Sequence, residues 1–159
     1  PLSGLAITGH LWLLQQIYGR VTIPVAVADE LRRGGHDDPR IDAVLLLNWV
    51  EVRQPTDHSL VEFLQGDRNL DRGESEAIAL ALELGADELL IDERLGRREA
   101  SRLGLSITGL LGVLLVAKKQ EKISVIRPIM DILMNEAGFR VSDLLYSEVL
   151  TVAGEMDDE

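Results

Sequence analysis

Hydrophobic positions along the chain follow two spacings, one typical of helices and one typical of short buried strands. Leu11, Leu14 and Tyr18 recur at helical intervals and predict a helix over 10–18 that ends at Gly19. The same spacing predicts further helices over 25–33, 40–47, 73–84, 93–103, 110–121, 128–137 and 142–153, and Asp57 or Ser59 is a candidate cap for a short helix through Leu64. Apolar or β-branched runs predict four strands at 21–23, 49–53, 88–92 and 105–108.

The order of these elements predicts an α/β fold with a small parallel sheet. Strand, helix and strand alternate over 88–108, which favours parallel strands joined by right-handed crossovers. The run Leu89-Leu90-Ile91 is continuously apolar, as in strands buried on both faces. Four strands make a small sheet, so we expect at least one more strand before Pro1. We predict a single domain over 1–154, followed by an acidic tail over 155–159.

The amino-acid composition excludes several classes of protein. A chain of 159 residues with 46% hydrophobic residues fits one globular domain. The absence of cysteine excludes a disulfide framework, a cysteine-based zinc site and a thiol nucleophile. The longest apolar stretch, 105–117, is shorter than the roughly 20 residues that cross a bilayer. We therefore expect a cytoplasmic protein with no membrane partner.

The chain carries a net charge of −11, which disfavours a broad, nonspecific grip on phosphate backbones. The charge is compatible with metal binding or with a basic partner, and solubility alone explains it equally well. Glycine-rich phosphate loops of the G-x-x-x-x-G-K-[ST] and G-x-G-x-x-G types are absent from the sequence, as is the G-x-S-x-G motif.

Three acidic positions are candidates for chemistry. Asp92 ends a strand, and ligands of open α/β sheets bind beyond the carboxyl ends of strands. A cap on the following helix is an equally good interpretation of Asp92. Glu74 and Glu76 lie in a first helical turn, where acids complement the helix dipole. They are two positions apart, so at most one faces the same point as Asp92. Glu30, taken alone, is typical of a surface acid.

Four arginines follow Asp92 on the next predicted helix: Arg94, Arg97, Arg98 and Arg102. One interpretation is a solvated face whose arginines pair with Glu93 and Glu99. The other is a local patch that contacts phosphates in an otherwise acidic protein.

The sequence resembles a prokaryotic subfamily of PIN-domain proteins, similar to VapC-type toxin ribonucleases. The resemblance is carried by Gly-Glu-Ser-Glu-Ala-Ile over 73–78 and by Ile-Asp-Glu over 91–93. It also includes Ile-Pro at 23–24, Glu-Leu at 30–31 and Gly-Phe-Arg-Val-Ser over 138–142, and so spans nearly the whole chain.

The resemblance implies a three-layer α/β/α fold with a five-stranded parallel sheet. It implies a cluster of acids that binds Mg²⁺ or Mn²⁺ for phosphodiester hydrolysis, and these acids map to Glu30, Glu74 and Asp92. Glu76 and Glu93 belong to the motif without an assigned role. Arg94 or Arg97 would steady the backbone of the substrate.

The chain departs from the family at its start. Family members carry a first metal-binding aspartate at the end of a central strand, just before the segment that matches Pro1 and Leu2. That strand lies outside the sequence given, so we expect exposed apolar faces, unpaired strand edges and weakened metal binding.

Two functional hypotheses follow. The first is a metal-dependent ribonuclease, the toxin of a toxin–antitoxin pair, with RNA as substrate and an antitoxin protein as partner. The second is a module of the same fold that binds nucleic acid or a protein with little catalysis. The family and the apolar C-terminal helices also suggest a homodimer, although these helices could equally cover the sheet. The apolar residues concerned are Ile129, Ile132, Leu133, Leu144, Leu145 and Val149.

Overall fold

The computed structural model describes residues 1–156. Its strands are β1 (Val21–Pro24), β2 (Val50–Arg53), β3 (Leu89–Leu90) and β4 (Ile107–Thr108). Its helices are α1 (Leu2–Thr8), α2 (Trp12–Tyr18), α3 (Val25–Gly35), α4 (Pro39–Asp42), the 3₁₀ helix η1 (Ala43–Leu46), α5 (His58–Gly66), α6 (Arg72–Leu84), α7 (Arg94–Arg102), α8 (Leu110–Lys119), α9 (Arg127–Asn135) and α10 (Asp143–Val152).

The predicted elements are confirmed, with local differences. All four strands form, but β3 and β4 contain only two residues each. The helix predicted over 40–47 is divided: its first half belongs to the α-helix α4, and its second half forms the tighter 3₁₀ helix η1. The sequence pattern did not predict α1, which lies directly before α2.

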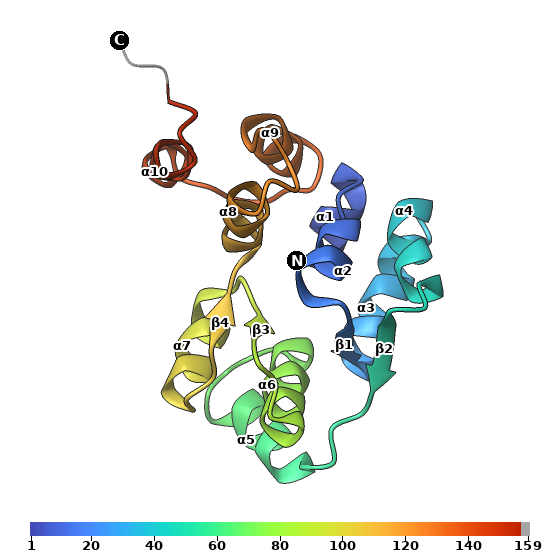
Figure 1. The fold of residues 1–159 in the computed structure, drawn as a ribbon. Coiled ribbons are helices and arrows are strands. Elements are labelled where there is room, and N and C mark those ends of the chain that lie inside the picture. Colours follow the sequence, from blue (N-terminus) through green and yellow to red (C-terminus); the bar gives the residue numbers. More distant parts are fainter. Residues whose placement is uncertain (157–159) are drawn as a thin grey trace.

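The strands form two separate parallel pairs rather than one sheet (Figure 1). β1 pairs with β2, with Val21 opposite Val50, and β3 pairs with β4, with Leu89 opposite Ile107. The α/β class and the parallel strands are therefore confirmed. The expected single sheet is divided, because the edges of β1 and β3 that face one another are not paired within residues 1–156.

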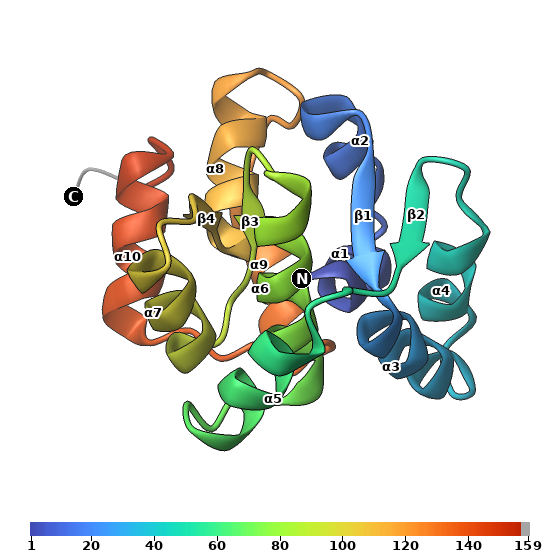
Figure 2. The ribbon, with the colours of Figure 1, turned by 90° about the horizontal axis from the view of Figure 1, so that it is seen from below.

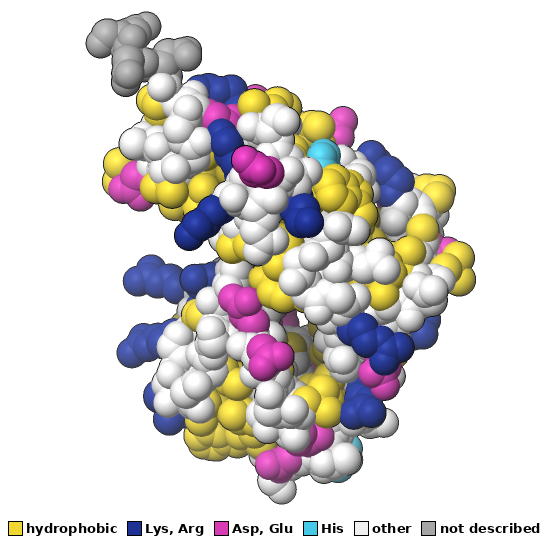
Figure 3. Space-filling view, viewed as in Figure 1, with side chains coloured by type: hydrophobic (Ala, Val, Ile, Leu, Met, Phe, Trp, Pro, Cys, Tyr) yellow, Lys and Arg dark blue, Asp and Glu magenta, His cyan; other side chains and the backbone are white. Residues whose placement is uncertain are grey.

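A cavity of about 850 Å³ separates β1 from β3. Residues of both strands line it. Pro1 also lines the cavity, and the two ribbon views place the start of the chain between the two pairs of strands (Figures 1 and 2). The space-filling view shows a hollow between the same two parts of the molecule (Figure 3).

The buried apolar side chains form two clusters, one on each side of this cavity. The larger cluster joins α1, α2, α8, α9 and α10 to β1 through side chains such as Leu14, Leu114 and Met130. The smaller cluster joins α5, α6, α7 and β3 and includes Ile78 and Ile91. α6 packs against both β1 and β3, so it connects the two parts.

The C-terminal helices divide their apolar residues between core and surface. Ile129, Leu133 and Val149 are buried in the larger cluster, which is the covering role considered for these helices. Leu144 and Leu145 are exposed on α10. None of the helices within residues 1–156 is long and apolar enough to cross a membrane.

The first residue of the predicted acidic tail is held against the body of the protein. The backbone N–H groups of Ile126 and Arg127 donate to the Glu155 carboxylate at 2.8 and 3.1 Å, and Nζ of Lys118 lies 2.9 Å from it. Glu155 therefore ties the chain beyond α10 to the start of α9. Residues 157–159 of the predicted tail lie outside the described residues.

Candidate active site

Acidic side chains from three elements line one end of the cavity. Glu30 comes from α3, Glu74 from the first turn of α6, and Asp92 follows β3. Asp71 and Glu93 line the same cavity. Because α3 follows β1 directly, these acids lie at the carboxyl ends of β1 and β3, where ligands of parallel sheets bind.

Glu30 lies against Gly73, the glycine of the Gly-Glu-Ser-Glu segment. A β-carbon at position 73 would stand 2.6 Å from Oε1 of Glu30, closer than real side chains approach. A glycine at this position therefore lets the Glu30 carboxylate lie on the first turn of α6, beside Glu74.

The two carboxylate oxygens of Glu74 differ in their hydrogen bonding. Its Oε2 accepts from the backbone N–H of Asp71 at 3.3 Å, while the backbone N–H of Glu74 donates to Asp71 at 2.8 Å. This reciprocal pair is a capping box at the start of α6. The other oxygen, Oε1, is buried and has no hydrogen-bond partner within residues 1–156. It lies 3.3 Å from the position of a β-carbon on Gly96.

Asp92 caps a helix, but not the one that follows it. The cap position of α7 is Glu93, which makes no side-chain cap hydrogen bond. Instead, Oδ1 of Asp92 accepts from the backbone N–H of Leu110 at 2.7 Å, at the start of α8. Its second oxygen, Oδ2, lies 3.7 Å from the nitrogen of Pro1. One carboxylate oxygen thus holds α8, and the other is free of that cap.

Glu76 points away from this site. Its Oε1 accepts from the backbone N–H of Ala26 at 3.2 Å, in the first turn of α3, and its Oε2 lies 2.8 Å from Nε of Arg72. The Glu76 side chain is only 6% exposed. The two glutamates of the motif therefore separate into Glu74, which faces the cavity, and Glu76, which joins α6 to α3.

Burial and a neighbouring acid raise the pKa values of Glu30 and Glu74. Partial loss of solvent, followed by the charge of Asp71, raises the pKa of Glu30. The same two causes, in the same order, raise the pKa of Glu74, and the hydrogen bond from the backbone of Asp71 opposes them. Clustered carboxylates resist ionisation together, and a bound cation would relieve that repulsion.

The arginines of α7 differ in their surroundings. Arg102 pairs with Glu99 at 2.8 Å, and Arg94 and Arg98 are exposed without an ion pair among the described residues. Arg97 is half-buried, and its Nη1 donates to the carbonyl of Ile91 at 3.0 Å. Positive side chains gather over this edge of the molecule in Figure 3.

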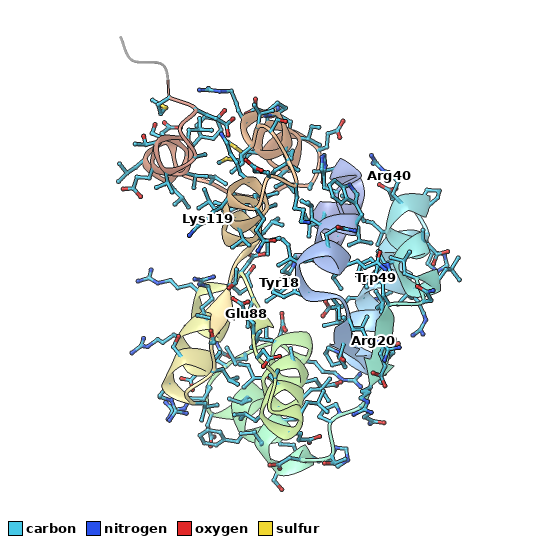
Figure 4. The ribbon with its side chains drawn as sticks, in the orientation of Figure 1. Tyr18, Arg20, Arg40, Trp49, Glu88 and Lys119 are labelled. Carbon is cyan, nitrogen blue, oxygen red and sulfur yellow. The ribbon has the colours of Figure 1, made fainter. Side chains whose placement is uncertain are left out.

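A second set of polar side chains, Tyr18 and Glu88, lines the opposite end of the cavity. Tyr18, at the end of α2, and Glu88, just before β3, lie on its two walls (Figure 4). The hydroxyl of Thr108 donates to Glu88. Burial, the charge of Glu88 and a hydrogen bond to it raise the pKa of Tyr18 to about 12.

The donor set suits a hard divalent cation, but it is not assembled into a closed cage. Carboxylate oxygens are the ligands that Mg²⁺ and Mn²⁺ prefer, and the buried Oε1 of Glu74 is free to accept one. Across residues 1–156, however, no three acidic or histidine side chains come close enough to hold an ion.

A comparison with family models matches residues 1–155 to a family described as the PIN domain. The chain belongs to the PIN-domain family. No curated protein and no solved structure matches it. Membership indicates a nuclease-type function and a nucleic-acid substrate, and PIN-domain nucleases typically use divalent metal ions.

Sequence reasoning missed two features of this PIN domain. Asp71 joins the acidic group, and the Asp-x-x-Glu spacing of a capping box could have identified it. Gly73 and Gly109 leave room for the candidate acids Glu30 and Asp92, whereas a β-carbon on Gly96 would meet Ile91 first, at 2.6 Å, and Glu74 at 3.3 Å. Only a three-dimensional structure shows which acid lies over which glycine.

Proposed function

We propose that the protein is a metal-dependent ribonuclease that hydrolyses phosphodiester bonds in RNA. The observation that supports this most directly is the arrival of Glu30, Glu74 and Asp92, from three separate elements, at one end of a single cavity. PIN-domain membership supports the same class of reaction.

We propose Glu30, Glu74 and Asp92 as ligands of Mg²⁺ or Mn²⁺, directly or through water. When bound, such an ion supplies an activated water and neutralises charge on the phosphoryl oxygens. The chain's own part is to hold the acids in place. Oδ1 of Asp92 is fixed by Leu110, and Oε2 of Glu74 is fixed by Asp71. Arg94, exposed at the start of α7, would contact the backbone of the substrate.

Incubation with single-stranded and structured RNA, with and without Mn²⁺, tests this function. We expect cleavage that requires Mn²⁺ and is lost in Asp92→Asn, which keeps the acceptor oxygen for Leu110 but removes the charge. Cleavage that persists in Asp92→Asn would contradict a role for Asp92. Cleavage without Mn²⁺ would contradict the metal dependence.

A second candidate function is binding without cleavage. It is favoured by one observation, that no three ligating side chains are assembled in the described part of the chain. A folded protein that binds RNA, shows no thermal shift at millimolar Mn²⁺ and releases no product would support this binding module over the nuclease.

We further propose a cytoplasmic toxin of the VapC-like kind, with an antitoxin protein as partner. The resemblance of the Gly-Glu-Ser-Glu-Ala-Ile and Ile-Asp-Glu segments to that subfamily supports it. We expect expression of the protein to arrest bacterial growth, and expression of Asp92→Asn to leave growth unaffected. Equal growth of both cultures would argue against toxicity.

We also propose a homodimer formed through the exposed face of α10. Leu144, Leu145 and Val152 are 71%, 41% and 74% exposed, and helical geometry brings them onto one side of the helix. Sedimentation equilibrium should show a dimer that Leu144→Asp converts to a monomer. Leu46→Asp is the matched control, because Leu46 is 84% exposed on η1. A monomeric wild-type protein would contradict the proposal.

A further inference from the structure

Arg97 and Asp92 share the space beside Gly109. A β-carbon built on Gly109 would lie 2.7 Å from Nη1 of Arg97 and 2.9 Å from Oδ1 of Asp92. Both distances are shorter than the 3.0 Å below which real β-carbons are essentially never found. The guanidinium and the carboxylate can therefore both lie against residue 109 only because it has no side chain.

Both charged groups are also bound to backbone at this junction. Nη1 of Arg97 donates to the carbonyl of Ile91 at 3.0 Å, and the N–H of Leu110 donates to Asp92 at 2.7 Å. The N–H of Ile91 donates in turn to the carbonyl of Thr108 at 3.0 Å. The carbonyl of Ile91 belongs to the peptide unit from which Asp92 projects. Arg97 thus fixes the orientation of that peptide plane.

We propose that Arg97 is a positioning residue for Asp92 rather than a contact of the substrate. By holding the carbonyl of Ile91, it fixes Oδ1 of Asp92 on α8 and leaves Oδ2 for the cavity. Its consequence for cleavage rests on the proposed function. The role differs from that of Arg94, which is exposed and has no ion pair among the described residues.

The kinetic test compares Arg97→Ala with Arg98→Ala. Arg98 is the matched control, since it follows Arg97 on the same helix and is exposed. We expect Arg97→Ala to lower kcat about ten- to a hundredfold with KM unchanged, because a misplacement of about 1 Å can cost about a hundredfold. Arg98→Ala should leave kcat unchanged. A raised KM with unchanged kcat in Arg97→Ala would make Arg97 a substrate contact and overturn the proposal.

A second measurement is independent of activity. Amide hydrogen exchange followed by NMR reports whether the Leu110 N–H keeps its acceptor, Asp92. We expect faster exchange at Leu110 in Arg97→Ala and in Gly109→Ala, where the added methyl group displaces both Arg97 and Asp92, and unchanged exchange in Arg98→Ala. Combining Arg97→Ala with Gly109→Ala should change the exchange rate at Leu110 little more than either substitution alone.

These outcomes distinguish failure of the proposed ribonuclease activity from failure of the positioning role of Arg97. Absence of cleavage by the wild-type protein would defeat the proposed ribonuclease, and the exchange data would still decide the role of Arg97. Unchanged exchange at Leu110 in Arg97→Ala would overturn the positioning role whether or not the protein cleaves RNA.

Discussion

Replacing Gly73 by alanine should separate the stability of the protein from its activity. The new β-carbon would stand 2.6 Å from Oε1 of Glu30 and 3.3 Å from its carboxyl carbon. Ordinary contact begins at 3.4 Å, so the carboxylate must move by about 0.8 Å. Glu30 is exposed, and its side chain can rotate away without disturbing the core.

The expected effects on stability and on activity have opposite signs. Glycine within a helix is less stable than alanine by roughly 0.5–1 kcal/mol, and Gly73 is the second residue of α6, so a gain of a few tenths of a kcal/mol is expected. A ligand displaced by about 1 Å can lower a rate by about a hundredfold. Gly73→Ala should therefore be as stable as the wild type, or slightly more stable, and cleave RNA far more slowly.

Urea denaturation and Mn²⁺-dependent cleavage, measured on the same preparation, test this reasoning. Gly66→Ala is the matched control, because a β-carbon at Gly66 meets no atom within 4 Å. Combining Gly73→Ala with Glu30→Ala should cost little more activity than Glu30→Ala alone. Full activity in Gly73→Ala, or a loss of stability above about 1 kcal/mol, would refute the argument.

Three further predictions concern single side chains. Asp92→Ala should lower the free energy of unfolding by about 1 kcal/mol through loss of the α8 cap, and Asp92→Asn by less, as measured by urea denaturation. Burial opposes ionisation of Glu155, but hydrogen bonds from Lys118 and the backbone outweigh it and lower its pKa. Its contribution to stability should thus be complete above the unfolded pKa and lost as pH falls through the folded value. Glu155→Ala should cost about 2 kcal/mol at pH 7 and much less in acid. The pKa of Tyr18 is raised from 10.0 to about 12, so stability should fall as pH rises from 10 to 12, and Tyr18→Phe should reduce that fall in alkaline melting curves.

The elements could be predicted because their signals are local. Pro24 ends β1 and precedes α3, Asp57 caps α5 by accepting from the N–H of Leu60, and Gly85 ends α6 in a left-handed conformation. Each of these signals lies within a few residues of the boundary that it sets.

The site was predicted only in part, because its contacts join distant segments. The motif identified Glu74 and Asp92, but Asp92 bonds to Leu110, 18 positions away, and Glu76 bonds to Ala26, 50 positions away. Helix spacing correctly separated Glu74 from Glu76, but could not show which of them faces the cavity. The apolar runs did not show which strands pair, whereas the family resemblance led us to expect unpaired strand edges.

Helix α6 links the two pairs of strands and, with them, the acids that follow β1 and β3. Glu30 follows β1 and Asp92 follows β3, and α6, which carries Glu74, packs on both. No ladder of hydrogen bonds between β1 and β3 fixes their spacing in the described part of the chain. The packing of α6 therefore relates the positions of Glu30, Glu74 and Asp92 to one another. A substitution that shifts α6 against either pair of strands would move Glu74 relative to Glu30 or Asp92.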